Sequence, residues 1–390
     1  MNKGAQQGIG RGAGQFLVLT ALYVLLEWIS SLHEFKGLPF IAWDPGLGLL
    51  FCALILRPQV AAPALFAGII CAEALFIATA ADLLRVLVFA LIITSTYAIT
   101  ARLVARPHAG FDTSLPRMRD VAWLIAGGTI GAFCSAALLI AFLIARGELA
   151  WGEVISAGWP HVVGDVIGIG TVTPLFLQLF AARGRLNLAA LAKAWPEIVA
   201  FAVAIGVFAT VARLGESDAL QFFYILFIPT MLAAARFGLF GATLMLSVTE
   251  LALVIWLEWV DADPSHFTAY QTLMLLLGLT GLLVGTLISE RDAARLKVAA
   301  LEAEATRAAR FNLVSGMASA LLHDLSQPLT AARARARTVQ LLSEAGDLVR
   351  LKENLTPLLT QIDRASTILH GMRDFMGRGT NSQQPFDWAT

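Results

Sequence analysis

Residues 269–310 read AYQTLMLLLGLTGLLVGTLISERDAARLKVAALEAEATRAAR, and their character changes abruptly after residue 289. Residues 269–289 carry no charged side chain, and about 20 mostly apolar residues are enough to cross the hydrocarbon core of a bilayer. Residues 290–310 are rich in Ala, Glu and Arg and contain neither Gly nor Pro, which strongly favours helix. We therefore expect the last membrane helix to continue out of the bilayer as a helical signalling linker over residues 290–310.

The chain before this linker has the composition of an integral membrane protein. Of its 390 residues, 57% are hydrophobic and only 14% are charged, whereas soluble globular proteins carry about 25% charged residues. Lys and Arg together number 28, as do Asp and Glu, so the net charge is zero. These values exclude a soluble enzyme and a nucleic-acid-binding protein that relies on charge. The expected fold class is all-α, with a polytopic transmembrane helical bundle over residues 16–289.

Ten segments are apolar enough to be spans, and eight spans with one re-entrant pair are the alternative. The ten cover residues 16–32, 38–56, 60–81, 83–105, 120–145, 154–181, 196–213, 220–235, 238–258 and 269–289. With ten spans and a cytoplasmic N-terminal tail (residues 1–15), eleven Lys and Arg residues fall in cytoplasmic segments before residue 289 and four fall outside. Because cytoplasmic loops collect Lys and Arg, this distribution predicts that both termini are cytoplasmic.

Several ionisable side chains lie within these spans, where a charge is expensive unless it is paired or hydrated. They are Glu27, Asp44, Glu73, His161, Asp165 and Glu250. His161 and Asp165 are four residues apart and therefore share one face of a helix. Such groups can bind a ligand or respond to protons, or they can serve only to tie helices together by hydrogen bonds. The three cysteines, Cys52, Cys71 and Cys134, show no metal-binding or disulfide spacing.

Three motifs resemble the type-one membrane-associated sensor (MASE) domains. Trp43-Asp44-Pro45-Gly46-Leu47-Gly48 looks like the early motif of that family. Trp159-Pro160-His161, followed by Gly164-Asp165 and Thr173-Pro174-Leu175, is similar to its middle segment, and Phe227 through Gly238 is similar to its late segment. The resemblance covers most of residues 15–289 and implies an integral-membrane sensory domain. The sensing candidates are therefore Trp43, Asp44, Glu73, His161, Asp165, Arg236 and Glu250.

A distinctive chemical motif, LLHDLSQPL at residues 321–329, follows the linker. Apolar residues at positions 311, 314, 318, 321 and 325 form a heptad seam that places His323 at the outermost position, f. Its imidazole should therefore point to solvent, and Pro328 should bend the helix just beyond it. An exposed imidazole beside the carboxylate of Asp324 suits a phosphoacceptor, because the carboxylate can orient the ring or take its proton.

A second apolar helix follows a predicted turn at residues 343–347. Its apolar residues run at alternating three- and four-residue spacing from Leu348 to Met376, with Pro357 as the one anomaly. The two helices should form an antiparallel hairpin, and two hairpins can bury their seams together in a four-helix bundle. We therefore expect a homodimer. His370, near the end of the second helix, is expected to be an ordinary surface residue.

Residues 311–378 resemble the dimerisation and phosphoacceptor domain of sensor histidine kinases. The resemblance implies that His323 is the phosphorylated residue, that Asp324 is the adjacent acidic residue, and that Gln327 occupies the position used in dephosphorylation. It also implies a bacterial inner-membrane protein-histidine kinase of a two-component system, whose partner is the receiver domain of a response regulator. No nucleic acid partner and no cofactor or metal bound by this chain is expected.

The Asn box and glycine-rich boxes of the family's ATP-binding domain do not occur in the sequence. Residues 379–390 are expected to be a linker to that domain, which would bind ATP and Mg²⁺ either in a longer polypeptide or in trans. The alternative is a transporter, or a transporter-like membrane receptor, with a dimerisation tail, because buried acids and helices broken by Gly and Pro also suit transport.

Overall fold

The computed structural model describes residues 3–30, 42–76, 83–106, 110–181, 194–213, 219–259 and 267–378. Throughout these ranges every regular element is a helix, so the all-α prediction is confirmed. The chain divides into two compact units, Met1–Arg295 and Leu296–Thr390. The predicted linker at residues 379–390 lies outside the described residues.

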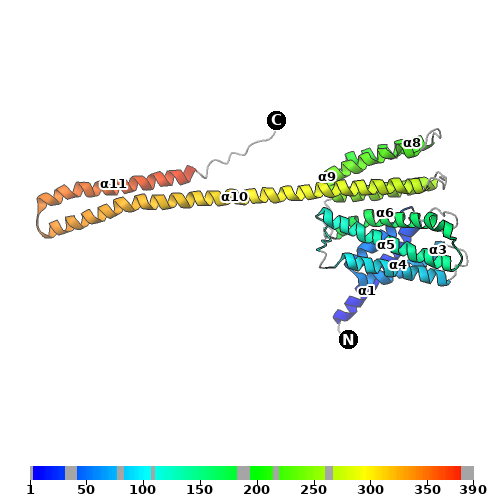
Figure 1. The fold of residues 1–390 in the computed structure, drawn as a ribbon. Helices are drawn as coiled ribbons and strands as arrows, with labels where there is room; N and C mark the ends of the chain where they lie inside the picture. The colour runs from blue at the N-terminus through cyan, green and yellow to red at the C-terminus, as the bar shows by residue number, and fades with distance from the viewer. Residues whose placement is uncertain are drawn as a thin grey trace. The chain divides into compact units, whose positions relative to one another are not determined.

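The first unit contains long apolar helices that run roughly parallel to one another (Figure 1). They are α1 (Lys3–Ser30), α2 (Pro45–Leu56), α3 (Pro58–Phe76), α4 (Leu83–Val104), α5 (Met118–Ala145), α6 (Val154–Ala181), α8 (Trp195–Arg213), α9 (Phe227–Trp259) and the first part of α10 (Phe267–Glu344). Two short 3-10 helices, Trp151–Glu153 and Ala219–Leu226, precede α6 and α9.

Within the described residues, seven helices are long and apolar enough to cross a membrane, and two shorter apolar helices, Pro45–Leu56 and Trp195–Val211, accompany them. One of the seven, α9, is divided at Gly238, whose backbone is left-handed (φ 61°). A Cβ added to Gly241 would overlap the carbonyl oxygen of Ala233. Residues eight apart cannot meet along a straight helix, so the chain reverses at Gly238 and α9 is a helical hairpin. The predicted pair 220–235 and 238–258 corresponds to the arms of this hairpin, although the first arm begins with 3-10 geometry.

Helix α6 is the centre of the first unit and contacts α2, α5 and α9. Glycines let the backbones of α6 and α2 approach each other closely. A Cβ on Gly168 of α6 would overlap the carbonyl oxygen of Asp44, and a Cβ on Gly48 of α2 would overlap the carbonyl oxygen of Gly168. Small residues let transmembrane backbones meet in this way. The crossing holds the beginning of α2 against the middle of α6, where the polar residues of both segments gather.

In the second unit, the end of α10 and α11 (Leu348–Arg378) form an antiparallel hairpin (Figure 1). The turn lies where the sequence predicts it. Gly346 has φ 74°, and the Asp347 carboxylate accepts a hydrogen bond from the Arg350 N–H at 3.1 Å. Helix α10 continues through Pro328 and α11 through Pro357, so neither proline ends its helix. A proline removes a single backbone donor, and the bonds on either side of it remain.

Candidate functional site

The beginning of α2 places Asp44 against α6. Its carboxylate accepts a hydrogen bond from the Leu47 N–H at 2.6 Å and so caps the helix, while its own N–H donates to the Gly164 carbonyl at 3.3 Å. Pro45 suits the first helical position because its missing N–H would have no partner there. The Trp-Asp-Pro motif thus forms a helix start whose residues are buried inside the bundle.

A first polar group connects α4, α5 and α6. The Tyr97 hydroxyl donates to the Asp165 carboxylate, and His161 Nε2 lies 3.5 Å from Asp165 Oδ2 and 3.5 Å from Ser135 Oγ. Asp44 interacts electrostatically with both His161 and Asp165. The side chain of Asp165 is 5% exposed and that of His161 is 24% exposed. The imidazole therefore gives this buried group a route to the surface of the bundle.

A second polar group centres on Thr171. The Trp43 indole N–H donates to Thr171 Oγ1 at 3.3 Å, and the same oxygen lies 2.9 Å from the Ile167 carbonyl and 2.9 Å from Glu250 Oε2. Glu250 is fully buried, and within the described structure its Oε1 has no hydrogen-bond partner. This group therefore ties α9 to α6 and to the segment before α2.

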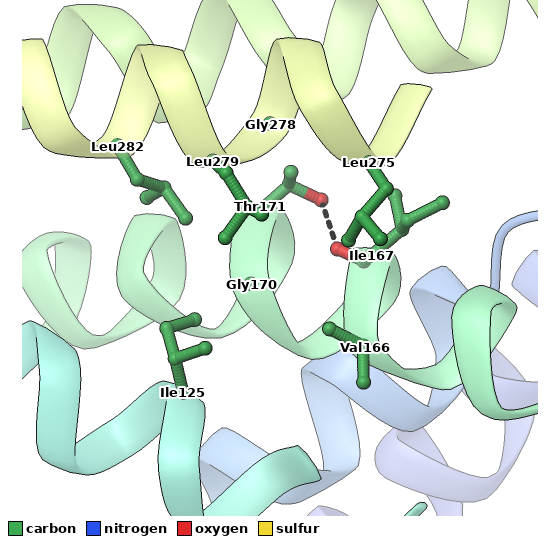
Figure 2. A pocket seen from close by; sticks show the side chains of 9 residues that line it. All are labelled: Ile125, Val166, Ile167, Gly170, Thr171, Leu275, Gly278, Leu279 and Leu282. Carbon is green, nitrogen blue, oxygen red and sulfur yellow. Dashed lines mark hydrogen bonds between the residues drawn. The ribbon is translucent and has the colours of Figure 1, made fainter. Parts of the chain in front are cut away.

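A small pocket lies beside Thr171, between α5, α6 and α10 (Figure 2). Gly170 and Thr171 of α6 face Gly278 of α10 across it, and leucine, isoleucine and valine side chains complete its lining. Its volume of about 10 Å³ is close to the least that holds one water molecule. Near the start of α10, Gln271 Nε2 donates to the carbonyls of Pro160 at 3.0 Å and Ala42 at 3.4 Å. Helix α10 therefore contacts the polar region at two levels.

The structure brings together five of the seven sensing candidates and leaves two apart. Trp43, Asp44, His161, Asp165 and Glu250 belong to the two polar groups. Arg236 instead pairs with Glu197 of α8, with Nη1 2.9 Å from Oε1. Glu73 lies on α3, and among the described residues it makes no hydrogen bond to either group.

Tyr97, Ser135, Thr171 and Gln271 belong to the site but are absent from the predicted set. The predicted set contains charged side chains, His161 and Trp43 but no hydroxyl or amide group, because such groups are common in transmembrane helices. The one signal in the sequence is a cluster of hydroxyl-bearing residues, Thr94, Ser95, Thr96, Tyr97 and Thr100, in a mostly apolar span. Among the described residues, no group of three or more His, Cys, Asp or Glu side chains could hold a metal ion.

In the second unit, His323, Asp324 and Gln327 are all exposed, whereas Pro328 is buried. Gln327 Nε2 lies 3.3 Å from His323 Nε2, one helical turn away. The amide is therefore within reach of one of the two ring nitrogens that could react with an electrophile.

Comparison with known proteins identifies the first unit. The MASE1 family matches residues 14–292, which include both polar groups. The chain belongs to the MASE1 family. Its membrane part is therefore a sensor domain, as the three motifs predict. The MASE1 region ends at residue 292, so the hairpin with His323 lies outside it.

One curated relative is the sensor protein TdiS of Thauera aromatica, which is 27% identical over 129 residues. The match covers 33% of this chain and 22% of that protein, so the chain spans well under two thirds of its relative. No solved structure matches the chain. The relative supports a sensor role, in agreement with the MASE1 domain.

Proposed function

We propose that this protein is a membrane sensor histidine kinase of a two-component system. The observation that carries the proposal is an exposed His323, followed by Asp324, on a helical hairpin whose first helix begins inside the MASE1 domain. The sensor relative supports the same assignment. A stimulus that changes the membrane helices would act on the hairpin through α10.

His323 is the proposed phosphoacceptor. A ring nitrogen attacks the γ-phosphorus of ATP, the bond between that phosphorus and the ADP oxygen breaks, and Asp324 accepts the ring proton. The phosphoryl group then passes to an aspartate of a response regulator. ATP and Mg²⁺ would be held by an ATP-binding domain, in cis in a longer polypeptide or in trans. Gln327, beside the ring, is positioned to orient a water molecule for dephosphorylation.

The hairpin supports a homodimer. Large apolar side chains remain exposed on both of its helices. They include Leu322, Leu329 and Leu341 on α10, and Leu348, Leu359, Ile362 and Leu369 on α11. Such a surface is unfavourable in water, and a second copy of the hairpin would bury it in a four-helix bundle.

The proposed sensing site comprises Asp44, His161 and Asp165, together with Tyr97. It combines carboxylates, an imidazole and a partly exposed entry point within the membrane domain, so it can respond to a polar ligand or to protons. With both termini cytoplasmic in a bacterial inner membrane, the residue 161 end of α6 would face outward.

The kinase proposal is tested by phosphorylation of the native protein in its own membranes. With Mg²⁺ and ATP labelled at the γ-phosphate, we expect acid-labile, alkali-stable label on the protein. His323→Gln should abolish the label, and His370→Gln is the matched control because His370 is an exposed histidine of the same hairpin. Label that persists in His323→Gln would refute the assignment. Substrate flux into vesicles that survives His323→Ala would favour the transporter alternative.

A further inference from the structure

Helix α10 packs against the α9 hairpin through a stripe of small residues. Gly278, Gly281, Gly285 and Ser289 lie three or four residues apart and therefore on one face of α10. A Cβ on Gly281 would stand 3.0 Å from Thr230 Cγ2 and 3.0 Å from Leu246 Cδ1. These residues belong to the two arms of the hairpin, so α10 contacts both arms.

Near the turn of the hairpin, the two backbones almost touch. A Cβ on Gly285 would lie 2.7 Å from the Ala242 Cβ, 3.0 Å from the Leu239 Cα and 3.2 Å from the Gly238 carbonyl oxygen. Because the residues of the stripe lack large side chains, they form no knobs that lock into holes of the α9 hairpin. Along residues 278–289, the apolar contact therefore offers little resistance to a shift of α10 along its axis.

Ser289 supplies a polar contact at the end of the stripe. The Leu239 N–H donates to Ser289 Oγ at 2.8 Å. Leu239 begins the second arm of the hairpin, where backbone N–H groups have no partner within the helix. The preceding residue, Gly238, has no side chain that could cap the helix, and a Cβ there would overlap Ser289 Oγ. The cap of this arm therefore comes from a different helix.

The next residue of α10 makes a similar contact with α5. Glu290 Oε2 accepts a hydrogen bond from the N–H of Met118 at 3.4 Å, and Met118 is the first residue of α5. Arg117, which precedes it, makes no side-chain capping bond. Ser289 and Glu290, which are consecutive in α10, thus accept hydrogen bonds from backbone N–H groups at the N-terminal ends of two other membrane helices. Both contacts lie where α10 leaves the bundle.

We propose that Ser289, assisted by Glu290, is a latch that sets the position of α10 in the membrane domain. In this proposal, a stimulus shifts α10 along its glycine-rich face, and the shift breaks the hydrogen bond from the Leu239 N–H to Ser289 Oγ. The proposal rests on the proposed sensor function for its biological meaning, but the latch itself is a property of residues 118–290.

The first test is amide hydrogen exchange of the full chain in lipid nanodiscs. Ser289→Ala removes the capping oxygen, and we expect at least tenfold faster exchange at Leu239, which corresponds to the loss of about one hydrogen bond. Ser289→Thr keeps the hydroxyl and should restore slow exchange. Thr280→Ala is the matched control, because Thr280 is a half-buried α10 residue whose hydroxyl, among the described residues, donates within its own helix to the Leu276 carbonyl. Unchanged exchange at Leu239 in Ser289→Ala would overturn the latch.

The second test asks whether the latch positions α10. Spin labels at Arg119→Cys and Arg295→Cys, with the three native cysteines replaced and the labelled protein diluted with unlabelled chain, report the position of α10 relative to α5. We expect a shifted or broadened distance distribution in Ser289→Ala and an unchanged one in Thr280→Ala. Fast exchange at Leu239 with an unchanged distribution would also overturn the proposal. A shifted distribution in a protein that never phosphorylates His323 would refute the kinase assignment but not the latch.

Discussion

At the scale of single residues, several buried polar side chains of the membrane domain bond to partners on other segments of the chain. Asp165 receives the Tyr97 hydroxyl, and Thr171 links Trp43 to Glu250. A buried acceptor that loses its donor pays the full desolvation penalty of that group. Each of these side chains therefore fixes the relative position of two helices, whether or not it also touches a ligand.

Tyr97→Phe should destabilise the protein by about 1–3 kcal/mol, because it removes the hydroxyl from the buried carboxylate of Asp165. The ring remains and keeps its edge contact with Phe51, at 6.0 Å between centroids. Thermal unfolding in detergent measures the effect. Tyr224→Phe is the control, since Tyr224 is 62% exposed. Equal unfolding midpoints for the two variants would contradict the importance of the Tyr97 bond.

At the scale of helices, the architecture depends on two places where backbones meet without side chains between them. One is the crossing of α2 and α6 at Gly48 and Gly168, and the other is the contact of α10 with the α9 turn at Gly238 and Gly285. Neither can take a methyl group without moving a helix. The other glycines of the membrane domain are not all equivalent, because some face open space.

Gly168→Ala should abolish the recovery of folded protein, because the new Cβ would overlap the Asp44 carbonyl oxygen, which is a backbone atom and cannot rotate away. Gly206→Ala in α8 is the matched control, since nothing lies within 4 Å of its added Cβ and alanine favours helix over glycine by about 1 kcal/mol. Size-exclusion chromatography of detergent-solubilised protein measures recovery. A monodisperse Gly168→Ala protein at normal yield would show that the crossing is less tight than described.

Insertion of one, two or three residues after Arg295 tests whether α10 transmits the signal as one rigid helix. Each inserted residue rotates the chain beyond it by about 100°, so phosphorylation of His323 should vary with the number inserted, in step with the helical period. Equal phosphorylation in all three variants would mean that the helix does not carry rotation. Circular dichroism serves as the control that helix content is kept.

At the scale of the whole molecule, a membrane sensor domain and a helical hairpin are joined through a single helix that belongs to both. The hairpin exposes apolar side chains of α10 and α11 that a monomer would leave in water. In the proposed function, dimerisation and signalling would be coupled, because the proposed four-helix bundle that presents His323 would form only between two chains.

Ile362→Glu should shift the detergent-solubilised protein from dimer to monomer in native mass spectrometry, because Ile362 is 48% exposed in the single chain and a charge there opposes burial at the seam. Thr367→Glu places the same charge at an exposed polar position of α11 and should leave the dimer intact. A dimer that survives Ile362→Glu would move the contact between copies to another part of the chain.

The sequence predicts those features that depend on a local pattern. The length of the apolar segments predicts the membrane helices. The four-residue spacing of His161 and Asp165 predicts that they share a helix face, and the residues around Gly346 predict the turn of the hairpin. The periodicity of apolar residues does not predict which helices pack against each other. The bond between Tyr97 and Asp165 and the cap that Ser289 gives to Leu239 join residues far apart in the chain, so no local pattern could predict them.

The shortness of α2 determines how deep the polar groups lie. Its 12 residues extend about 18 Å at 1.5 Å per residue, against a hydrocarbon core about 30 Å thick. If Arg57, at the far end of α2, marks one face of the membrane, Asp44 lies about 12 Å below the other. A charge that enters the His161–Asp165 group from that other side crosses about two fifths of the transmembrane voltage. Occupancy of the site by an ion would therefore depend on the membrane potential as well as on the concentration of the ion.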